Sequence, residues 1–297
     1  MAIGYACLTA GIKNTKLSGC ILKNATEEKL RCIILKNMEA LNHIIDYNIE
    51  NNIRLFRVSS DIIPFGSHPV NQLPWWKDYK EKLDELGAKI KRSGIRISMH
   101  PGQYTVLNSP DAGVVQKAIR DLEYHDRLLA ALRADESCKL VLHIGGSYGD
   151  KVKAANAFIM NYGQLPESIR NRLVIENDDR NYNIEDILQI SSETGAPAIF
   201  DNLHHKLNPP DTAFTDAEWI IHCGSTWKER DGLQKIHYSQ QKEGGKPGCH
   251  SDTILIDEFM AYYVKLPYHN LDIMLEVKDK NISAVKCMKA IDSWLAY

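Results

Sequence analysis

Short apolar runs alternate with longer amphipathic stretches along this chain. The runs are rich in β-branched residues and are bounded by polar segments, which is typical of buried strands. They are Ile3–Leu8, Arg54–Ile62, Arg96–His100, Lys139–Ile144, Arg172–Glu176, Ala196–Asp201, Leu233–Tyr238 and Leu271–Val277. We interpret each run as one strand.

The stretches between these runs carry apolar residues at the spacing of a helix face. In the first of them, Leu30, Ile33, Ile34, Met38, Leu41 and Ile45 recur every three to four positions. The predicted helices are Glu27–Tyr47, Trp75–Lys91, Asp111–Leu132, Lys151–Met160, Ile184–Glu193, Asp216–Cys223, Thr253–Val264 and Ser283–Trp294. Strict alternation of strand and helix predicts parallel strands joined by helical crossovers. Eight repeats favour one closed (β/α)₈ barrel over residues 1–297, with an open doubly wound sheet as the structural alternative.

Composition adds little that is specific. The chain has 297 residues, 44% of them apolar and 25% charged, which is ordinary for a globular protein. Its net charge of −2 lacks the basic footprint of most nucleic-acid-binding proteins, although metal cations in a site could supply local positive charge. Seven scattered cysteines without a Cys-x-x-Cys pair are expected to be mostly buried thiols in a reducing cytoplasm. No signal peptide or membrane span is recognisable, so a cytoplasmic location is expected.

Potential metal ligands stand at, or just after, the ends of most predicted strands. They are His100, His143, Glu176, Asp201, His204, His237, His250 and Glu276. The carboxyl ends of barrel strands converge on one face, so these residues should meet there. A lone histidine on an apolar strand is more often a hydrogen-bonded core residue, but eight such residues at equivalent positions predict a metal centre. Imidazole and carboxylate ligands suit Zn²⁺, Mn²⁺ or Fe²⁺, and this number of ligands would serve two or three ions.

Several neighbours of these ligands have open interpretations. His205 should point away from His204 if the strand continues, as a residue behind the ligands or an exposed one. Asn177, Asp178 and Asp179 could orient ligands or be solvated loop residues. Lys235 should face the same side as His237, where it could bind a phosphate, be carbamylated, or extend to solvent.

Three further segments lie outside the ligand positions. The glycine-rich segment Ile144–Lys151 lacks the Gly-Lys-Ser/Thr of a phosphate-binding loop and predicts a turn into a helix. Trp75 and Trp76 should pack at the start of a helix. Lys242 and Lys246, in the loop Gln240–Pro247, could steer a polyanion or be plain surface charges.

The segment His100–Pro110, which reads HPGQYTVLNSP, resembles a signature of the UV damage endonucleases. The resemblance extends from Gly4 to Glu276 and includes Gly4–Tyr5, Phe65–Pro69, Glu176–Asp179, Asp201–His205, Lys235–Ser239 and His250–Asp252. This family is similar in fold to endonuclease IV and to sugar isomerases. It cleaves the phosphodiester directly 5′ to pyrimidine dimers, 6-4 photoproducts and some abasic sites, and it leaves a 3′-hydroxyl and a 5′-phosphate.

The resemblance implies roles for individual residues. The eight residues named above would be the ligands of up to three ions, with Mn²⁺ the usual metal and Zn²⁺ or another divalent ion an alternative. Lys235 would lie close to the cluster and His68 near the scissile phosphate, so the catalytic candidates are Glu176, Lys235 and His68. Tyr5, Gln103 and Tyr104 would probe the lesion, although packing at the barrel rim is the structural alternative for the two tyrosines.

The partner implied is damaged double-stranded DNA, bound by a monomer without a membrane or an obligate protein partner. Three other functions stay open at this point: a sugar isomerase or epimerase, an abasic-site endonuclease, and a non-catalytic protein that binds damaged DNA.

Overall fold

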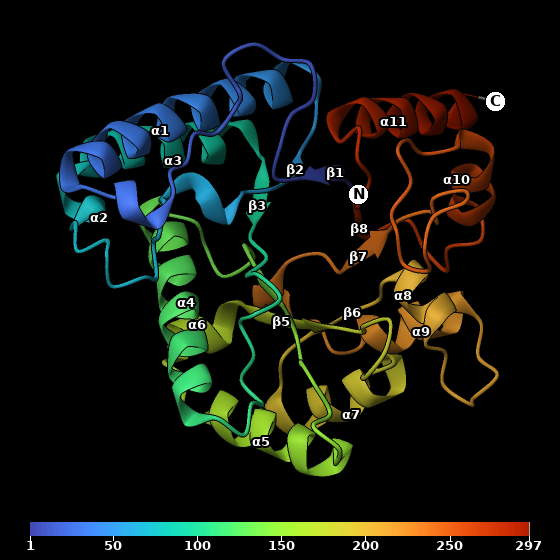
Figure 1. The fold of residues 1–297 in the computed structure, drawn as a ribbon. Coiled ribbons are helices and arrows are strands. Elements are labelled where there is room, and N and C mark those ends of the chain that lie inside the picture. The colour runs from blue at the N-terminus through green and yellow to red at the C-terminus, as the bar shows by residue number, and fades with distance from the viewer. Residues whose placement is uncertain (297) are drawn as a thin grey trace.

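Eight short parallel strands surround a common axis in the computed structural model, which describes residues 1–296 (Figure 1). They are β1 (Ile3–Ala6), β2 (Leu55–Arg57), β3 (Arg96–Ser98), β4 (Leu140–His143), β5 (Leu173–Glu176), β6 (Ala198–Ile199), β7 (Lys235–Tyr238) and β8 (Asp272–Leu275). Hydrogen-bonded ladders run in the orders β3-β2-β1-β8-β7 and β4-β5-β6. Parallel bridges between Met99 and Leu140, and between Asp201 and His237, join the two ladders into a ring. The predicted (β/α)₈ barrel is therefore confirmed, and the open sheet is excluded.

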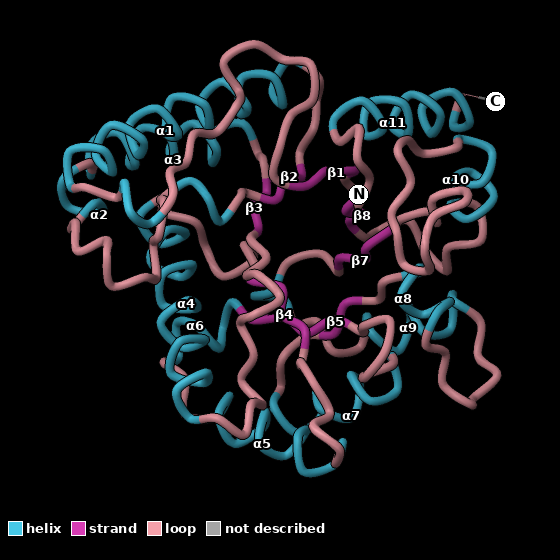
Figure 2. Tube along the Cα trace, viewed as in Figure 1, coloured by secondary structure: helices cyan, strands magenta, loops and turns pink. Residues whose placement is uncertain are grey.

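The helices form a layer outside the strands (Figure 2). They are α1 (Glu27–Glu50), α2 (Trp75–Asp78), α3 (Lys80–Ser93), α4 (Ala112–Ala131), α5 (Lys151–Gly163), α6 (Glu167–Arg172), α7 (Ile184–Thr194), α8 (Asn202–Leu207), α9 (Asp216–Gly224), α10 (Ile256–Tyr263) and α11 (Asn281–Leu295). Three 3₁₀ turns are η1 (Leu22–Asn24), η2 (Ser60–Ile62) and η3 (Glu229–Asp231). One apolar cluster, from Ile3 to Ile291, fills the space between the strands and this layer.

Local signals in the sequence fix several element ends. The Thr26 side chain accepts a hydrogen bond from the Lys29 backbone at the start of α1, and Asn183 caps α7 in the same way. Gly94 ends α3 with a φ of 67°, a left-handed conformation that glycine adopts without steric cost. Gly4 is required where β1 meets β2, because a Cβ there would lie 2.4 Å from the Leu55 carbonyl oxygen.

The predicted strands differ from the observed ones mainly at their carboxyl ends. The run Arg54–Ile62 ends as a strand at Arg57, because Ser59 caps the turn η2. The sixth strand shrinks to Ala198–Ile199, because Asp201 caps the helix α8. His204 and His205 thus lie on a helix and not on a continuing strand, which corrects that part of the prediction. The fifth strand begins at Leu173, one residue late, and the helix predicted over Trp75–Lys91 is divided into α2 and α3.

The amino-terminal end of the barrel is closed by buried charges. Lys139 Nζ lies 2.5 Å from Asp231 Oδ1, and both side chains are buried. Arg96 donates to the Asp231 and Leu233 carbonyls and pairs with Asp272 at 3.0 Å. These groups satisfy one another, which allows charged side chains at a buried barrel end.

Other predictions have clear outcomes. The segment Ile144–Lys151 is a turn that leads into α5, and Trp75 packs against Trp76 and Tyr124 at the start of α2, as predicted. The cysteines are all free thiols, but only Cys138, Cys223 and Cys287 are buried, so the prediction that most are buried is wrong. Among the described residues, no helix has the length and apolar character needed to cross a bilayer.

Candidate metal centre

Glu176 is the common member of three groups of potential metal ligands. It ends β5 and is 1% exposed. The groups are His100, His143 and Glu176; Glu176, Asp201 and His204; and Glu176, His237 and Glu276. In each group, one ligand atom per residue lies within 4.8 Å of the others. Five strand ends and the first turn of α8 therefore deliver their side chains to one small volume.

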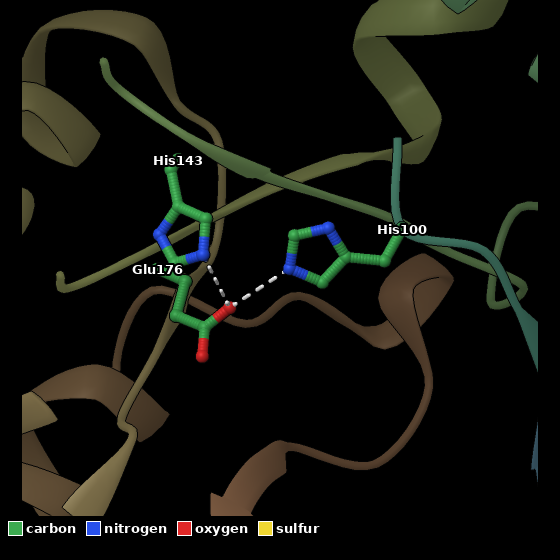
Figure 3. A group of neighbouring side chains, drawn as sticks. All are labelled: His100, His143 and Glu176. Carbon is green, nitrogen blue, oxygen red and sulfur yellow. Dashed lines mark ion pairs between the residues drawn. The ribbon is translucent and has the colours of Figure 1, made fainter. Parts of the chain in front are cut away.

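The first group lies at the ends of β3, β4 and β5. His100 Nε2 is 3.4 Å and His143 Nε2 is 3.7 Å from Glu176 Oε2, and both rings point at that oxygen (Figure 3). Oε2 is buried and makes no hydrogen bond among the described residues. Two imidazole nitrogens and one carboxylate oxygen therefore surround a space that a cation could fill.

The second group depends on Asn177 as well as on its own members. The side-chain amide of Asn177 donates to the Asp201 backbone carbonyl and accepts from the Asp201 backbone nitrogen. The backbone carbonyl of Asn177 accepts from His204 Nδ1 at 2.9 Å. Asp201 Oδ1 accepts from the His204 backbone at 2.8 Å, whereas Oδ2 is buried without a partner. Asn177 thus orients both residues and leaves His204 Nε2 free to bind, as one interpretation of the sequence proposed.

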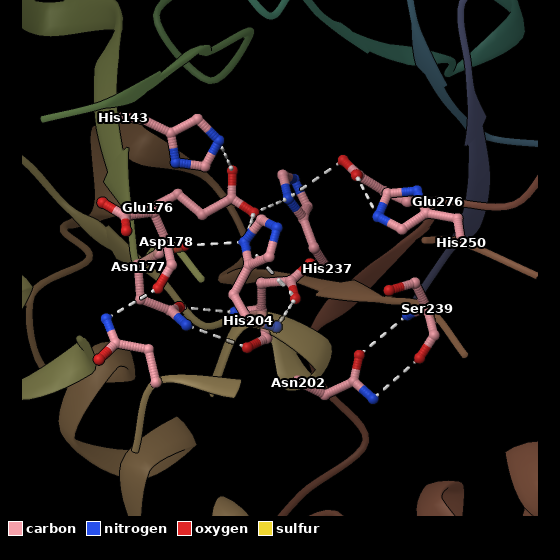
Figure 4. A network of polar contacts seen from close by, with 12 residues as sticks. His143, Glu176, Asn177, Asp178, Asn202, His204, His237, Ser239, His250 and Glu276 are labelled. Carbon is pink, nitrogen blue, oxygen red and sulfur yellow. Dashed lines mark hydrogen bonds and ion pairs between the residues drawn. The ribbon is translucent and has the colours of Figure 1, made fainter. Parts of the chain in front are cut away.

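The third group is contacted by an arginine that the sequence analysis missed. His237 Nδ1 is 2.6 Å from Glu176 Oε1 and 3.5 Å from Glu276 Oε1. His250 Nε2 lies 3.8 Å from Glu276 Oε2, at the edge of this network (Figure 4). Arg57, which ends β2, approaches Glu276 Oε1 at 2.6 Å and His237 Nε2 at 2.9 Å. Arg57 stands at a strand end, which could have marked it as a residue of the centre. The search for metal ligands did not select it, because arginine does not bind metal ions.

The charges in the centre are strongly perturbed. Burial alone would raise the pKa of Glu176, but the His237 and His143 imidazoles hold it well below its usual value. Burial raises the pKa of Asp201 to about 7. Burial opposes the proton on His204, yet the Asp201 and Glu176 carboxylates outweigh it and raise that pKa to about 9. Burial lowers the pKa of His237 to about 4. The carboxylates of this centre thus lie among imidazoles and the Arg57 guanidinium.

The donor set fits divalent metal ions. Buried oxygens of Glu176 and Asp201 lack hydrogen-bond partners, which costs free energy unless a cation or a water compensates them. The surrounding groups are imidazoles and carboxylates, and no cysteine belongs to any of the three groups. Such ligands favour Zn²⁺, Mn²⁺ or Fe²⁺ over a thiolate-bound structural metal.

Lys235 lies two residues before His237 and is completely buried. Its Nζ makes no hydrogen bond among the described residues, and burial together with the nearby Arg96 lowers its pKa well below the usual value. The alternative in which this side chain extends to solvent is therefore wrong. The Lys235 side chain therefore lies inside the barrel.

The other neighbours separate by location. His205 is 9% exposed and packs against Phe200 and Trp219, so it points away from the centre. Asp178 accepts hydrogen bonds from three backbone nitrogens of its own loop, and Asp179 approaches Arg180. These two aspartates shape the loop after β5 and orient none of the ligands directly.

A groove of about 820 Å³ opens beside the first two groups. His143 and His204 line it from the metal centre, and the segment Pro101–Val106 forms another part of its wall. Gln103 is exposed, and Tyr104 is 82% exposed. Tyr104 thus exposes an aromatic side chain on the wall of the groove that His143 and His204 also line.

The comparisons with known proteins agree with this geometry. A family model described as UV-endonuclease UvdE matches residues 2–295. The chain belongs to the UvdE family. It is 45% identical to the UV DNA damage endonuclease of Clostridium perfringens over 292 residues, which cover 98% of this chain and 71% of that protein. A putative UV-damage endonuclease of Acanthamoeba polyphaga mimivirus is 34% identical, with 96% and 89% covered. The predictions of the family and of an enzyme are confirmed.

Solved structures place the UvdE fold among related barrels. The crystal structure of SacUVDE superposes with a TM-score of 0.93 at 37% identity and covers 99% of both chains. Endonuclease IV from Thermus thermophilus gives a TM-score of 0.61 at 12% identity, again over 99% of both chains. A D-psicose 3-epimerase from Clostridium cellulolyticum gives 0.56 at 12% identity. The last two likenesses concern the fold alone.

Two residues that the UvdE resemblance singled out lie away from the metal centre. Tyr5 is fully buried, packs on Phe56 and donates its hydroxyl hydrogen to Asn48, which favours the packing role over contact with DNA. His68 is exposed and lines a separate hollow with Arg120. Its Nδ1 accepts a hydrogen bond from the Val70 backbone nitrogen at 3.1 Å. The structure therefore does not bring His68 into any of the three ligand groups.

Proposed function

We propose that this chain is a metal-dependent DNA repair endonuclease that nicks duplex DNA immediately 5′ to UV lesions. The lesions would be cyclobutane pyrimidine dimers, 6-4 photoproducts and some abasic sites, and the products a 3′-hydroxyl and a 5′-phosphate. The observation that carries the proposal is the shared groove, which has the Glu176-centred ligands on one side and the exposed Gln103–Tyr104 pair on another. The enzyme would act as a cytoplasmic monomer without an obligate protein partner.

The eight predicted ligands would bind up to three ions around Glu176. His100 and His143 would hold one ion with Glu176, Asp201 and His204 a second, and His237, Glu276 and His250 a third. Bound divalent ions, Mn²⁺ by preference, would activate water and stabilise the oxygens of an in-line phosphodiester displacement. Asn177 would keep Asp201 and His204 in place, and Arg57 would hold Glu276 against His237.

Lys235 and His68 would have supporting roles in the reaction. The Lys235 amine is buried and its pKa is lowered, which favours the unprotonated form that adds carbon dioxide. Addition would give a carbamate, release a proton and supply one more anionic ligand near Arg57. Native mass measurement should then show one added carbon dioxide, which Lys235→Met removes. His68 would contact the DNA backbone from its separate hollow, beside Arg120.

Lesion selection would rest on the deformability of the duplex. Unstacking nucleotides costs a few kcal/mol, and it costs least where damage has already weakened the stack. Tyr104 and Gln103 could fill the space that extruded nucleotides leave, and stacking of an aromatic ring on a base contributes about 1–3 kcal/mol. Lys246 is exposed and could steer the backbone, whereas Lys242 pairs with Asp252 at 2.8 Å.

The test uses three end-labelled duplexes, which contain one thymine dimer, one abasic site, or no damage. With Mn²⁺, we expect a nick immediately 5′ to the dimer, no nick in the undamaged duplex, and no nick after addition of a chelator. Cleavage of the abasic duplex alone would replace the proposal with an abasic-site endonuclease. No cleavage of any duplex by folded, metal-loaded protein would refute it, and an epimerase assay would come next.

A further inference from the structure

Tyr148 has a backbone conformation that is unfavourable for its side chain. It follows β4 in the glycine-rich loop, and its φ is 49°, in the left-handed region. A Cβ makes that region costly for residues other than glycine, asparagine and aspartate. Such conformations persist only where the surrounding structure enforces them, and they concentrate at functional sites.

The surrounding structure does enforce it. The Asn108 side chain donates to the Gly146 carbonyl at 2.7 Å, which ties the loop to the segment His100–Pro110. Gly145 has a φ of 114°, and a Cβ there would lie 2.4 Å from Asn108 Oδ1. The Tyr148 ring lies close over Gly146, 3.1 Å from where a Cβ of that glycine would be. The loop is therefore fixed, and the ring has a defined place.

That place is the wall of the groove that also contains Tyr104, His143 and His204. Tyr148 remains 52% exposed although it is a large aromatic residue. Packing in the core does not explain this residue, because its backbone is strained while its side chain is half exposed to solvent. Two exposed tyrosines from two separate loops thus line one groove beside the metal centre.

We propose that Tyr148 is a second aromatic contact for the unstacked nucleotides of the lesion and, with Tyr104, determines specificity for damaged duplex. This inference rests on the proposed function. A dimer links two adjacent bases, so one extruded lesion presents two bases to the groove. Stacking on aromatic rings tolerates any base, which suits recognition of damage in any sequence. The strained φ keeps the ring in position before DNA binds, so less ordering is needed on binding.

The test compares Tyr148→Gly, Tyr148→Phe and a control, Asn52→Gly. Asn52 also has a positive φ, 57°, but it precedes β2 at the opposite end of the barrel. Affinity is measured by fluorescence anisotropy in Mn²⁺, on an undamaged duplex and on one with a thymine dimer and a non-hydrolysable 5′ linkage. Thermal unfolding of each variant is recorded in parallel.

We expect Tyr148→Gly to bind the dimer duplex about tenfold more weakly, with the loss of one stacking contact. Its unfolding temperature should be equal or higher, because glycine accepts the left-handed φ. Tyr148→Phe and Asn52→Gly should bind as the unaltered protein does. Unchanged binding by Tyr148→Gly, or a lower unfolding temperature that marks a structural role, would overturn the inference alone. An unaltered protein without preference for the dimer would overturn the proposed function as well.

Discussion

Glu176 is the residue on which the account of the metal centre depends most. Two buried oxygens serve three groups of ligands, and imidazoles of His237 and His143 keep the carboxylate ionised despite its burial. An isolated buried carboxylate would instead take up a proton. The neighbouring ligands thus favour the ionised form of Glu176, which is the form that binds a cation.

Replacement of Glu176 by glutamine should therefore affect every group at once. The amide keeps the shape but carries no charge, so metal content should fall at all positions. Nicking should fall by more than about 100-fold, since even indirect partners of a metal ligand cause losses of that order. Elemental analysis of the purified variant and the dimer assay measure both. Glu193→Gln, on the exposed surface of α7, is the matched control, and equal metal content in the two variants would contradict the prediction.

Arg57 gives a prediction that separates fold stability from metal binding. Its guanidinium pairs with Glu276 at 2.6 Å inside the barrel. Arg57→Met should destabilise the metal-free protein by about 3–5 kcal/mol, because Glu276 is left buried and unpaired. Mn²⁺ should restore more stability to this variant than it adds to the unaltered protein, since it would occupy the same charge position. Thermal unfolding with and without Mn²⁺ tests this, and equal gains would count against it.

Position along the strands was enough to predict that most of the candidate ligands lie together. All members of the three groups stand at strand ends or one helical turn beyond, and a parallel barrel brings such positions together whatever the loops do. Tyr5 shows the limit of this reasoning. Side chains alternate between the interior of the barrel and the helix layer, and the sequence near Tyr5 is apolar on both sides, so its orientation could not be predicted.

At the scale of elements, the turn from β6 into α8 is the connection that builds the second group. The alternation of strand and helix predicted all eight crossovers, but it extended the sixth strand to Asp201, which caps a short helix. Asp201 both caps α8 and offers a free buried oxygen. Aspartate is a common helix cap, but Asp201 directly follows an apolar run and was therefore assigned to the end of the strand.

Two substitutions of Asp201 separate these roles. Asp201→Asn can still accept the hydrogen bond from the His204 backbone, so stability should change little while metal affinity falls. Asp201→Ala should lose the cap as well, at a further cost of about 0.5–2 kcal/mol in unfolding free energy. Chemical denaturation and Mn²⁺ titration give the two quantities. Equal stability of both variants would show that the cap is not needed.

At the scale of the whole molecule, the two ends of the barrel differ in how their buried polar groups are paired. The carboxyl-terminal end leaves buried oxygens without partners, whereas the amino-terminal end pairs its charges, as Lys139 and Asp231 do. Function is thus expected at the first end and stability at the second. Sequence periodicity predicted the barrel because eight repeats admit few arrangements, but it gave no sign of the buried pair, whose members lie 92 positions apart.

Lys139→Met should consequently reduce stability without changing the reaction. Asp231 would be left buried and unpaired, at a cost of about 3–5 kcal/mol, and the double variant Lys139→Met with Asp231→Leu should recover part of it. Urea denaturation measures the stability, and the dimer assay below the transition measures the reaction. A nicking rate per folded molecule that falls with the substitution would contradict the division between the two ends.

The most direct test of the account is anomalous diffraction from crystals of the protein grown with Mn²⁺, recorded at the manganese absorption edge. Two or three peaks are expected, each within bonding distance of ligands from one of the three groups and arranged around Glu176. Peaks elsewhere, or none in crystals that carry stoichiometric manganese, would contradict a metal centre at the carboxyl ends of the strands.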